Sequence, residues 1–226
     1  MQFVNFLIKP ASSLCNMRCR YCFYEDEAAN RTMASMGVMS RDTARLLIRE
    51  ALAAVDFNGR ISFAFQGGEP TVAGLDFFRF FVEETRRQNT RHIPIDWSIQ
   101  TNGLAVDDQW AEFFAQNRFL VGVSMDGDKA LHDEFRVDAA GRGTWTRVHA
   151  AVQRLQKAGA ELNLLCDLRE IDPEIEGLYY DMVVPLRAFG RLDPDGKPRH
   201  DLERVLNEAV NILDLRTPYD DSFYSS

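Results

Sequence analysis

Short apolar segments alternate with amphipathic segments along most of this chain. Five segments rich in β-branched and aromatic residues are predicted to be strands: residues 3–9, 61–65, 95–99, 119–124 and 162–166. Four segments between them carry apolar residues three and four positions apart and are predicted to be helices: residues 41–55 after the N-cap Ser40, 74–88, 107–117 and 144–158 before the C-cap Gly159. This alternation predicts a parallel sheet of βα units that curls into a full or partial barrel.

The alternation weakens after residue 168. Asp172 and Pro173 resemble a helix start, whereas Pro185 opposes both a central strand and a helix interior in residues 183–186. Residues 190–200 are predicted to be a turn-rich linker and residues 201–215 an amphipathic helix. We therefore predict an α/β partial (β/α) TIM-like barrel over residues 1–168 and an atypical, mostly helical C-terminal segment over residues 169–226.

The composition restricts the partners that the chain can bind. Its 226 residues carry a formal net charge of -8, without a lysine- or arginine-rich tract, and such a chain is repelled by nucleic acid phosphates. No apolar run approaches the length of a membrane span, and the N-terminus lacks a basic leader. We expect a soluble, cytoplasmic protein that binds neither nucleic acid nor membrane.

Three of the four cysteines form a CxxxCxxC run directly after the first predicted strand: Cys15, Cys19 and Cys22. Thiolates bind iron–sulfur clusters, and three ligands leave one iron of a four-iron cube open to an amine and a carboxylate. A zinc site usually takes four ligands, and the nearest downstream histidine is His92. A structural zinc site or a chance grouping remains the alternative. We expect Cys166 to be a buried thiol at a strand end.

Three further polar segments each follow a predicted strand: residues 66–70 (Gln-Gly-Gly-Glu-Pro), 100–103 (Gln-Thr-Asn-Gly) and 124–127 (Ser-Met-Asp-Gly). Each could be an ordinary turn. Together with the cysteine run they fall at the carboxyl ends of four consecutive strands, the edge where α/β proteins place their active sites. The glycines would allow the backbone to approach a ligand closely, and Glu69 could accept hydrogen bonds from an ammonium group.

With these segments the chain resembles the radical S-adenosylmethionine (SAM) superfamily. Within it, the resemblance is to the anaerobic sulfatase-maturating enzymes and related SPASM-type peptide-modifying enzymes. Residues 132–136 (His-Asp-Glu-Phe-Arg) and 143–145 (Gly-Thr-Trp) also match. The resemblance covers residues 3–166 and does not extend over residues 169–226.

The resemblance implies a role for each matching residue. Cys15, Cys19 and Cys22 would ligate a [4Fe–4S] cluster, whose fourth iron is chelated by SAM. The residues implied in SAM binding are Tyr21 near the adenine, Gly67, Gly68 and Glu69 at the amino group, and Ser124 and Arg136 at the methionyl carboxylate or the ribose. Gln66 belongs to the same implied SAM-binding group and would face a peptide substrate. Without the resemblance, the spacing of His132 and Arg136 would indicate a solvated surface helix, and we expect His132 and His92 at the surface or as caps.

The implied reaction is reductive cleavage of SAM, followed by hydrogen abstraction from a peptide or protein side chain. In sulfatase maturation this oxidises a cysteine or serine to formylglycine, with a reductant such as flavodoxin or ferredoxin. No position matches the family's catalytic base, so the catalytic residue is unassigned. Only Cys166 follows Cys22, too few cysteines for the family's auxiliary clusters. The alternative is an iron–sulfur and SAM-binding module without turnover.

Overall fold

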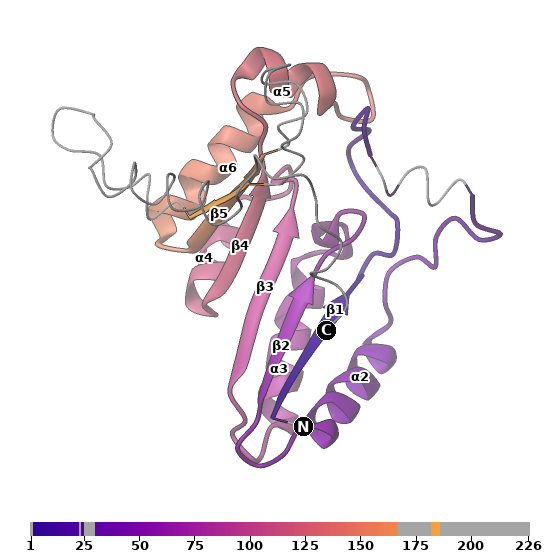
Figure 1. The fold of residues 1–226 in the computed structure, drawn as a ribbon, viewed down its shortest axis with the longest axis vertical. Helices are drawn as coiled ribbons and strands as arrows, with labels where there is room; N and C mark the ends of the chain where they lie inside the picture. Colours follow the sequence, from indigo (N-terminus) through magenta and orange to yellow (C-terminus); the bar gives the residue numbers. More distant parts are fainter. Residues whose placement is uncertain (1, 23, 25–29, 167–181, 186–226) are drawn as a thin grey trace, which may run out of the picture.

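Six strands form one sheet in the computed structural model, which describes residues 2–22, 24, 30–166 and 182–185 (Figure 1). In sheet order they are β1 (Phe3–Ile8), β2 (Arg60–Phe65), β3 (Ile95–Thr101), β4 (Phe119–Ser124), β5 (Glu161–Cys166) and β6 (Met182–Pro185). Neighbours from β1 to β5 pair in parallel, and β6 pairs antiparallel with β5. The predicted parallel sheet of five strands is confirmed.

Four helices connect the parallel strands as predicted: α2 (Arg41–Ala54), α3 (Leu75–Gln88), α4 (Asp108–Gln116) and α6 (Trp145–Ala158). Ser40 caps α2 by accepting a hydrogen bond from the Thr43 amide, and Gly159 ends α6 in the left-handed conformation. Two short helices were not predicted, η1 (Pro70–Ala73) and α5 (Lys129–Phe135). Both follow a predicted polar segment, so they bear directly on the site.

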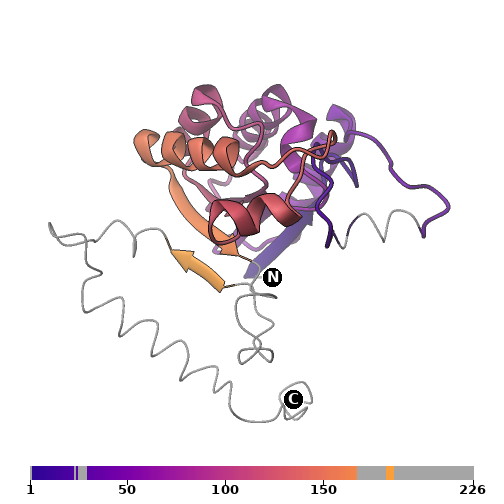
Figure 2. The same ribbon diagram turned by 90° about the horizontal axis from the view of Figure 1, so that it is seen from above.

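The helices gather on one side of the curved sheet (Figure 2). The aromatic core packs between this layer of helices and the sheet. Side chains alternate between the faces of a strand, so Ile61, Phe63 and Phe65 of β2 all point to the helices and are buried. Phe78 and Phe81 of α3 pack against Phe65 with ring centroids 4.9 and 5.2 Å apart. The phenylalanines of α3 are therefore part of the core.

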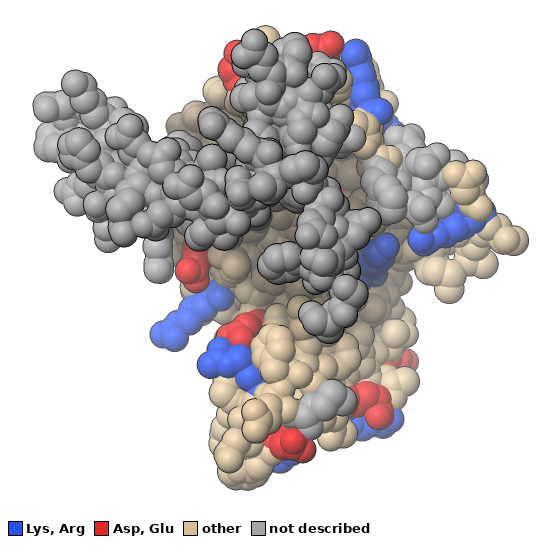
Figure 3. Space-filling model, in the orientation of Figure 1, with Lys and Arg blue, Asp and Glu red and all other residues tan. Residues whose placement is uncertain are grey.

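The opposite face of the sheet carries small and uncharged side chains at its middle. Ser62, Ala64, Ser98, Gln100 and Gly122 occupy the alternate positions and are half-buried. In Figure 3 the described part of this face is mostly uncharged, and acidic and basic side chains lie towards its margins. This is the face that would line the inside of a barrel.

The described strands form an open sheet, so the barrel is partial. Of residues 183–186, ambiguous in sequence, the first three belong to β6, and residue 186 lies outside the described residues. Among the described strands β6 is the last of the sheet, a position that suits Pro185 because proline has no backbone amide to donate. The boundary at residue 168, the helix start at Asp172, the linker and the helix over residues 201–215 lie outside the described residues and stay predictions. Among the described helices, none combines the length and apolar character needed to cross a bilayer.

Candidate active site at the carboxyl edge of the sheet

The predicted polar segments meet at the carboxyl edge of the parallel strands. The cysteine loop follows β1, and residues 66–70, 100–103 and 124–127 follow β2, β3 and β4. The Glu69 amide donates to the carbonyl of Leu14 at 2.8 Å, and the Asn102 side-chain amide donates to Asn16 Oδ1 at 2.7 Å. The turns after β2 and β3 therefore both contact the cysteine loop.

Gly68 allows the turn after β2 to press against the start of the cysteine loop. Its φ is +55°, and a Cβ at this position would lie 2.6 Å from the Leu14 carbonyl oxygen and 2.9 Å from that of Ser12. The sequence predicted that glycine would permit a close approach to a ligand. In the structure, the close approach is to the backbone that leads into Cys15.

The Glu69 carboxylate joins the turns after β2 and β3. It is 1% exposed, and its Oε1 accepts from the amide of Thr71 at 2.9 Å and from the hydroxyls of Thr71 and Thr101 at 2.6 and 2.7 Å. Its Oε2 accepts from the Asn102 amide at 2.7 Å. Burial raises the pKa of Glu69, and these hydrogen bonds act against that rise. This cross-linking was not predicted, and the role of Glu69 towards an ammonium group stays a prediction.

Cys15, Cys19 and Cys22 are free, half-buried thiols in the loop after β1. The Cys15 sulfur accepts from the amide of Met17 at 3.4 Å and from the Asn102 side chain at 3.7 Å. Burial raises the pKa of the Cys15 thiol, and it raises that of Cys19 to about 11 although the nearby Arg136 guanidinium lowers it. Because metals bind the thiolate, loading this loop with iron would release protons.

Cys15, Cys19 and Cys22 supply three free thiols from one loop after β1. Among the described residues, no three or more His, Cys, Asp or Glu side chains are arranged to hold a single metal ion. A four-iron cube presents a different iron to each thiolate and so takes more widely spread ligands. Three free thiols in one loop that the neighbouring turns hold in place are consistent with such a cube.

Tyr21 and Arg136 meet at a buried aspartate. Asp126 Oδ2 accepts from the Tyr21 hydroxyl at 2.5 Å and from Arg136 Nε at 2.7 Å, and the guanidinium lies 5.2 Å from the centre of the Tyr21 ring. Burial raises the pKa of Tyr21, so its hydroxyl keeps its proton at neutral pH. Sequence analysis missed the roles of Asp126 and Asn102, although both lie in segments that it singled out.

One prediction about residues 132–136 is wrong, the placement of His132 at the surface. His132 is completely buried rather than at the surface, because α5 turns it towards the start of α6. Arg136 is not on a solvated helix face: it follows the last residue of α5 and is 9% exposed. Its ion pair with Asp126 explains how the charge is accommodated there. His92 is exposed, as predicted.

A cavity of about 170 Å³ lies on the inner face of the sheet. Its lining includes Gln66, Gln100, Gly122 and Asn163. The Gln100 amide donates to the Ser124 hydroxyl at 3.0 Å, and a Cβ on Gly122 would lie 2.1 Å from Gln100 Oε1. Gly122 therefore leaves room for Gln100, a role that the sequence did not reveal.

A parallel half-barrel with a three-cysteine loop after its first strand and glycine-rich turns after the next strands is the architecture of radical SAM enzymes. Comparison with family models agrees, since the model described as the radical SAM superfamily matches residues 10–179. The chain belongs to the radical SAM superfamily.

Its relatives include anaerobic sulfatase-maturating enzymes. A cysteine-type enzyme of Clostridium novyi is 43% identical over an alignment covering 94% of this chain and 60% of the relative. A serine-type enzyme of Klebsiella aerogenes is 35% identical over 81% of this chain and 44% of the relative. A solved structure of native anSMEcpe with bound AdoMet and Cp18Cys peptide is 42% identical, with a TM-score of 0.67, over 73% of this chain and 43% of that one. The chain spans about half the length of these proteins.

Proposed function

We propose that this chain binds a [4Fe–4S] cluster through Cys15, Cys19 and Cys22, and SAM beside it. The supporting observation is the arrangement of the carboxyl edge, where the turns after β2 and β3 bond directly to the loop that carries the three thiols. When bound, the cluster would supply the electron for reductive cleavage of SAM, and the reaction would remove a hydrogen atom from a peptide or protein side chain.

The residues of the chain would bind and orient SAM. Glu69 Oε2 has accepting capacity left beyond the Asn102 amide and suits an ammonium group beside Gly67 and Gly68. The Arg136 guanidinium and the Ser124 hydroxyl could donate to a carboxylate or a ribose, and the Tyr21 ring offers an apolar surface to the adenine. Burial of Asp126 and Arg136 keeps water from this end of the site.

The proposed substrate is a cysteine or serine side chain in a sulfatase peptide, oxidised to formylglycine. The names of the relatives support this substrate, and so does the peptide bound in the solved structure. Gln66 and Gln100 line the cavity on the inner face and could hydrogen-bond to a peptide backbone there. A flavodoxin or ferredoxin would supply electrons from a cytoplasmic pool.

Anaerobic reconstitution with iron and sulfide tests cluster binding. We expect iron–sulfur absorbance in the wild type, loss of it when Cys15, Cys19 and Cys22 are changed to alanine, and full retention in Cys166→Ala. A protein that takes up zinc alone, or that keeps its iron–sulfur absorbance without the three thiols, would contradict the proposal.

Turnover is tested by reducing the loaded protein, adding SAM and measuring 5′-deoxyadenosine. A peptide with the sulfatase cysteine motif should lose mass, whereas the same peptide with that cysteine replaced by alanine should not. Cluster formation without 5′-deoxyadenosine would favour an iron–sulfur and SAM-binding module without turnover. Production of 5′-deoxyadenosine without a change in the peptide would exclude the substrate and leave the radical chemistry standing.

A further inference from the structure

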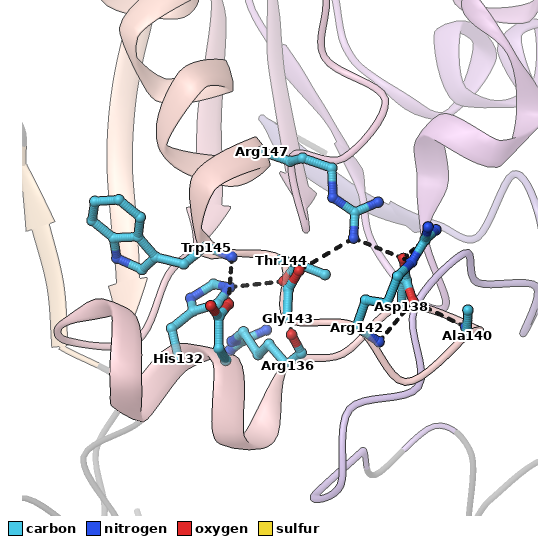
Figure 4. A network of polar contacts seen from close by, with 10 residues as sticks. His132, Arg136, Asp138, Ala140, Arg142, Gly143, Thr144, Trp145 and Arg147 are labelled. Carbon is cyan, nitrogen blue, oxygen red and sulfur yellow. Dashed lines mark hydrogen bonds and ion pairs between the residues drawn. The ribbon is translucent and has the colours of Figure 1, made fainter.

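The conspicuous motif of residues 132–136 and 143–145 is not explained by cluster or SAM binding. His132 and Thr144 are both completely buried, and His132 Nε2 lies 2.9 Å from Thr144 Oγ1 (Figure 4). Thr144 is the N-cap residue of α6, but its side chain makes no capping bond to the helix. Its hydroxyl is instead 2.8 Å from the Arg136 carbonyl oxygen, to which it donates. The side chains of His132 and Thr144 therefore form hydrogen bonds outside α6 instead of capping it.

The hydrogen bonds around His132 have one consistent direction. The amide of Asp126 is a donor and lies 3.3 Å from His132 Nδ1, so Nδ1 carries no proton. The neutral ring then bears its proton on Nε2 and donates it to the Thr144 hydroxyl, which donates onward to the Arg136 carbonyl. His132 and Thr144 thus fix the backbone of Asp126 at one end and of Arg136 at the other.

Those two backbones carry the ion pair that meets the cysteine loop. Asp126 accepts from Tyr21, which lies between Cys19 and Cys22, and the residues on either side of Arg136 bond to the loop backbone. The Arg18 amide donates to the Val137 carbonyl at 2.8 Å, and the Arg20 amide donates to the Phe135 carbonyl at 2.9 Å. Met17 also forms an antiparallel bridge with Asp138. Residues 17–20 therefore lie antiparallel to residues 135–138, joined by one isolated bridge and two backbone hydrogen bonds.

We infer that His132 and Thr144 are positioning residues, which hold residues 135–138 and through them the three thiols in the arrangement that a cluster requires. The inference rests on the proposed cluster binding and adds to it a pair of residues that fixes the conformation of the cysteine loop before the cluster binds. It assigns a function to two residues that contact the proposed SAM ligand Arg136 through its backbone and not through its guanidinium. Loss of the Thr144 hydroxyl should release the loop while the sheet and the core remain folded.

Neighbouring residues of residues 132–145 make further contacts that support the same positioning of residues 135–138. Asp133 Oδ1 accepts from the Trp145 amide at 2.7 Å, which joins α5 to the first turn of α6. A Cβ on Gly143 would lie 2.3 Å from Asp133 Cγ, so only glycine allows this contact. Asp138 accepts from Arg142 Nε and Arg147 Nη2 at 3.0 and 2.8 Å, which closes residues 138–142 into a tight turn (Figure 4).

Hydrogen exchange in the cluster-free protein tests the inference without any activity. Thr144→Val keeps the shape of the side chain and removes the hydroxyl, whereas Thr144→Ser keeps the hydroxyl. Thr85→Val is the matched control, because Thr85 is also buried and donates to one backbone carbonyl, that of Phe81, at 2.8 Å. We expect at least tenfold faster amide exchange at Arg18 and Arg20 in Thr144→Val, and wild-type rates in Thr144→Ser and Thr85→Val.

Cluster loading gives the second measurement. Thr144→Val should take up several-fold less iron and sulfide per chain than the wild type, while Thr144→Ser and Thr85→Val load normally. Equal exchange and equal loading in all variants would overturn the inference, and so would equal losses in Thr144→Val and Thr85→Val. A wild type that binds no cluster would instead overturn the proposed function. If Thr144→Val does not fold, Tyr21→Phe, which breaks the contact between the loop and Asp126, should show the same faster exchange.

Discussion

Substitution of Gly68 tests whether cluster loading depends on the close contact between the turn after β2 and the cysteine loop, rather than on backbone strain in that turn. Gly68→Ala should abolish cluster loading, because the new Cβ would collide with the backbone oxygens of Leu14 and Ser12. Gly67→Ala is the control: its φ of +97° is harder for alanine, but the three atoms nearest to the new Cβ belong to the flexible side chain of Lys9 rather than to the loop backbone. Iron content after reconstitution measures the difference. Equal loss in both variants would show that turn strain, not displacement of the loop, controls loading.

His132 makes the stability of the cluster-free protein depend on pH. Burial, together with the Arg136 charge, lowers the pKa of His132 from 6.5 to about 4. Between these values the unfolded chain binds a proton that the folded chain excludes. The contribution of His132 to the free energy of unfolding should therefore be fully present above pH 6.5, and the free energy of unfolding should fall as the pH drops towards 4. Urea unfolding at several pH values should show a shallower decline in His132→Gln. Parallel curves for the two proteins would contradict the assignment.

At the scale of elements, the strands and longer helices were predictable because each has a strong period of its own. The apolar positions of α2, α3 and α6 define one buried face each, and the five parallel strands are short apolar runs. The seven residues of α5 are too few to show a helical period, and the segment before them read as a turn. Contacts between loops, such as Asp126 with Tyr21, depend on sheet order and could not be derived from local sequence.

The N-cap of α5 should affect both stability and the cysteine loop. Asp128 Oδ1 accepts from the amides of Ala130 and Leu131 at 2.9 and 3.0 Å. Asp128→Ala should lower the free energy of unfolding by about 1 kcal/mol. Asp107→Ala, which removes the N-cap of α4, should cost a similar amount. Because α5 leads into residues 135–138, only Asp128→Ala should also reduce iron loading. The two effects are measured by urea unfolding and by iron analysis, and equal iron loading in both variants would disconnect α5 from the loop.

On the scale of the whole molecule, the two faces of the sheet differ. Helices cover one face, and the candidate site lies at one edge of the other face (Figure 1). The turns and the cysteine loop bond to one another across three consecutive strands, and none of these contacts needs a closed barrel. The contacts that position the proposed cluster ligands therefore include several made within the described part of the chain. Closure of the barrel would matter for enclosing a substrate on the inner face, not for holding the thiols.

The open sheet has a consequence for self-association. Among the described strands, β1 pairs only with β2, and Phe3 and Leu7 on β1 are 57% and 60% exposed. An unpaired edge strand with apolar side chains favours pairing with another chain, and a charged residue on the edge opposes it. We expect sedimentation velocity to show concentration-dependent association that Leu7→Lys weakens. Phe57→Lys is the matched control, because Phe57 is 75% exposed but lies in the loop between α2 and β2 and not in a strand. If Phe57→Lys weakens association as much as Leu7→Lys, general surface hydrophobicity rather than the β1 edge drives the association. A wild type that stays monomeric at every concentration would show that this edge does not pair.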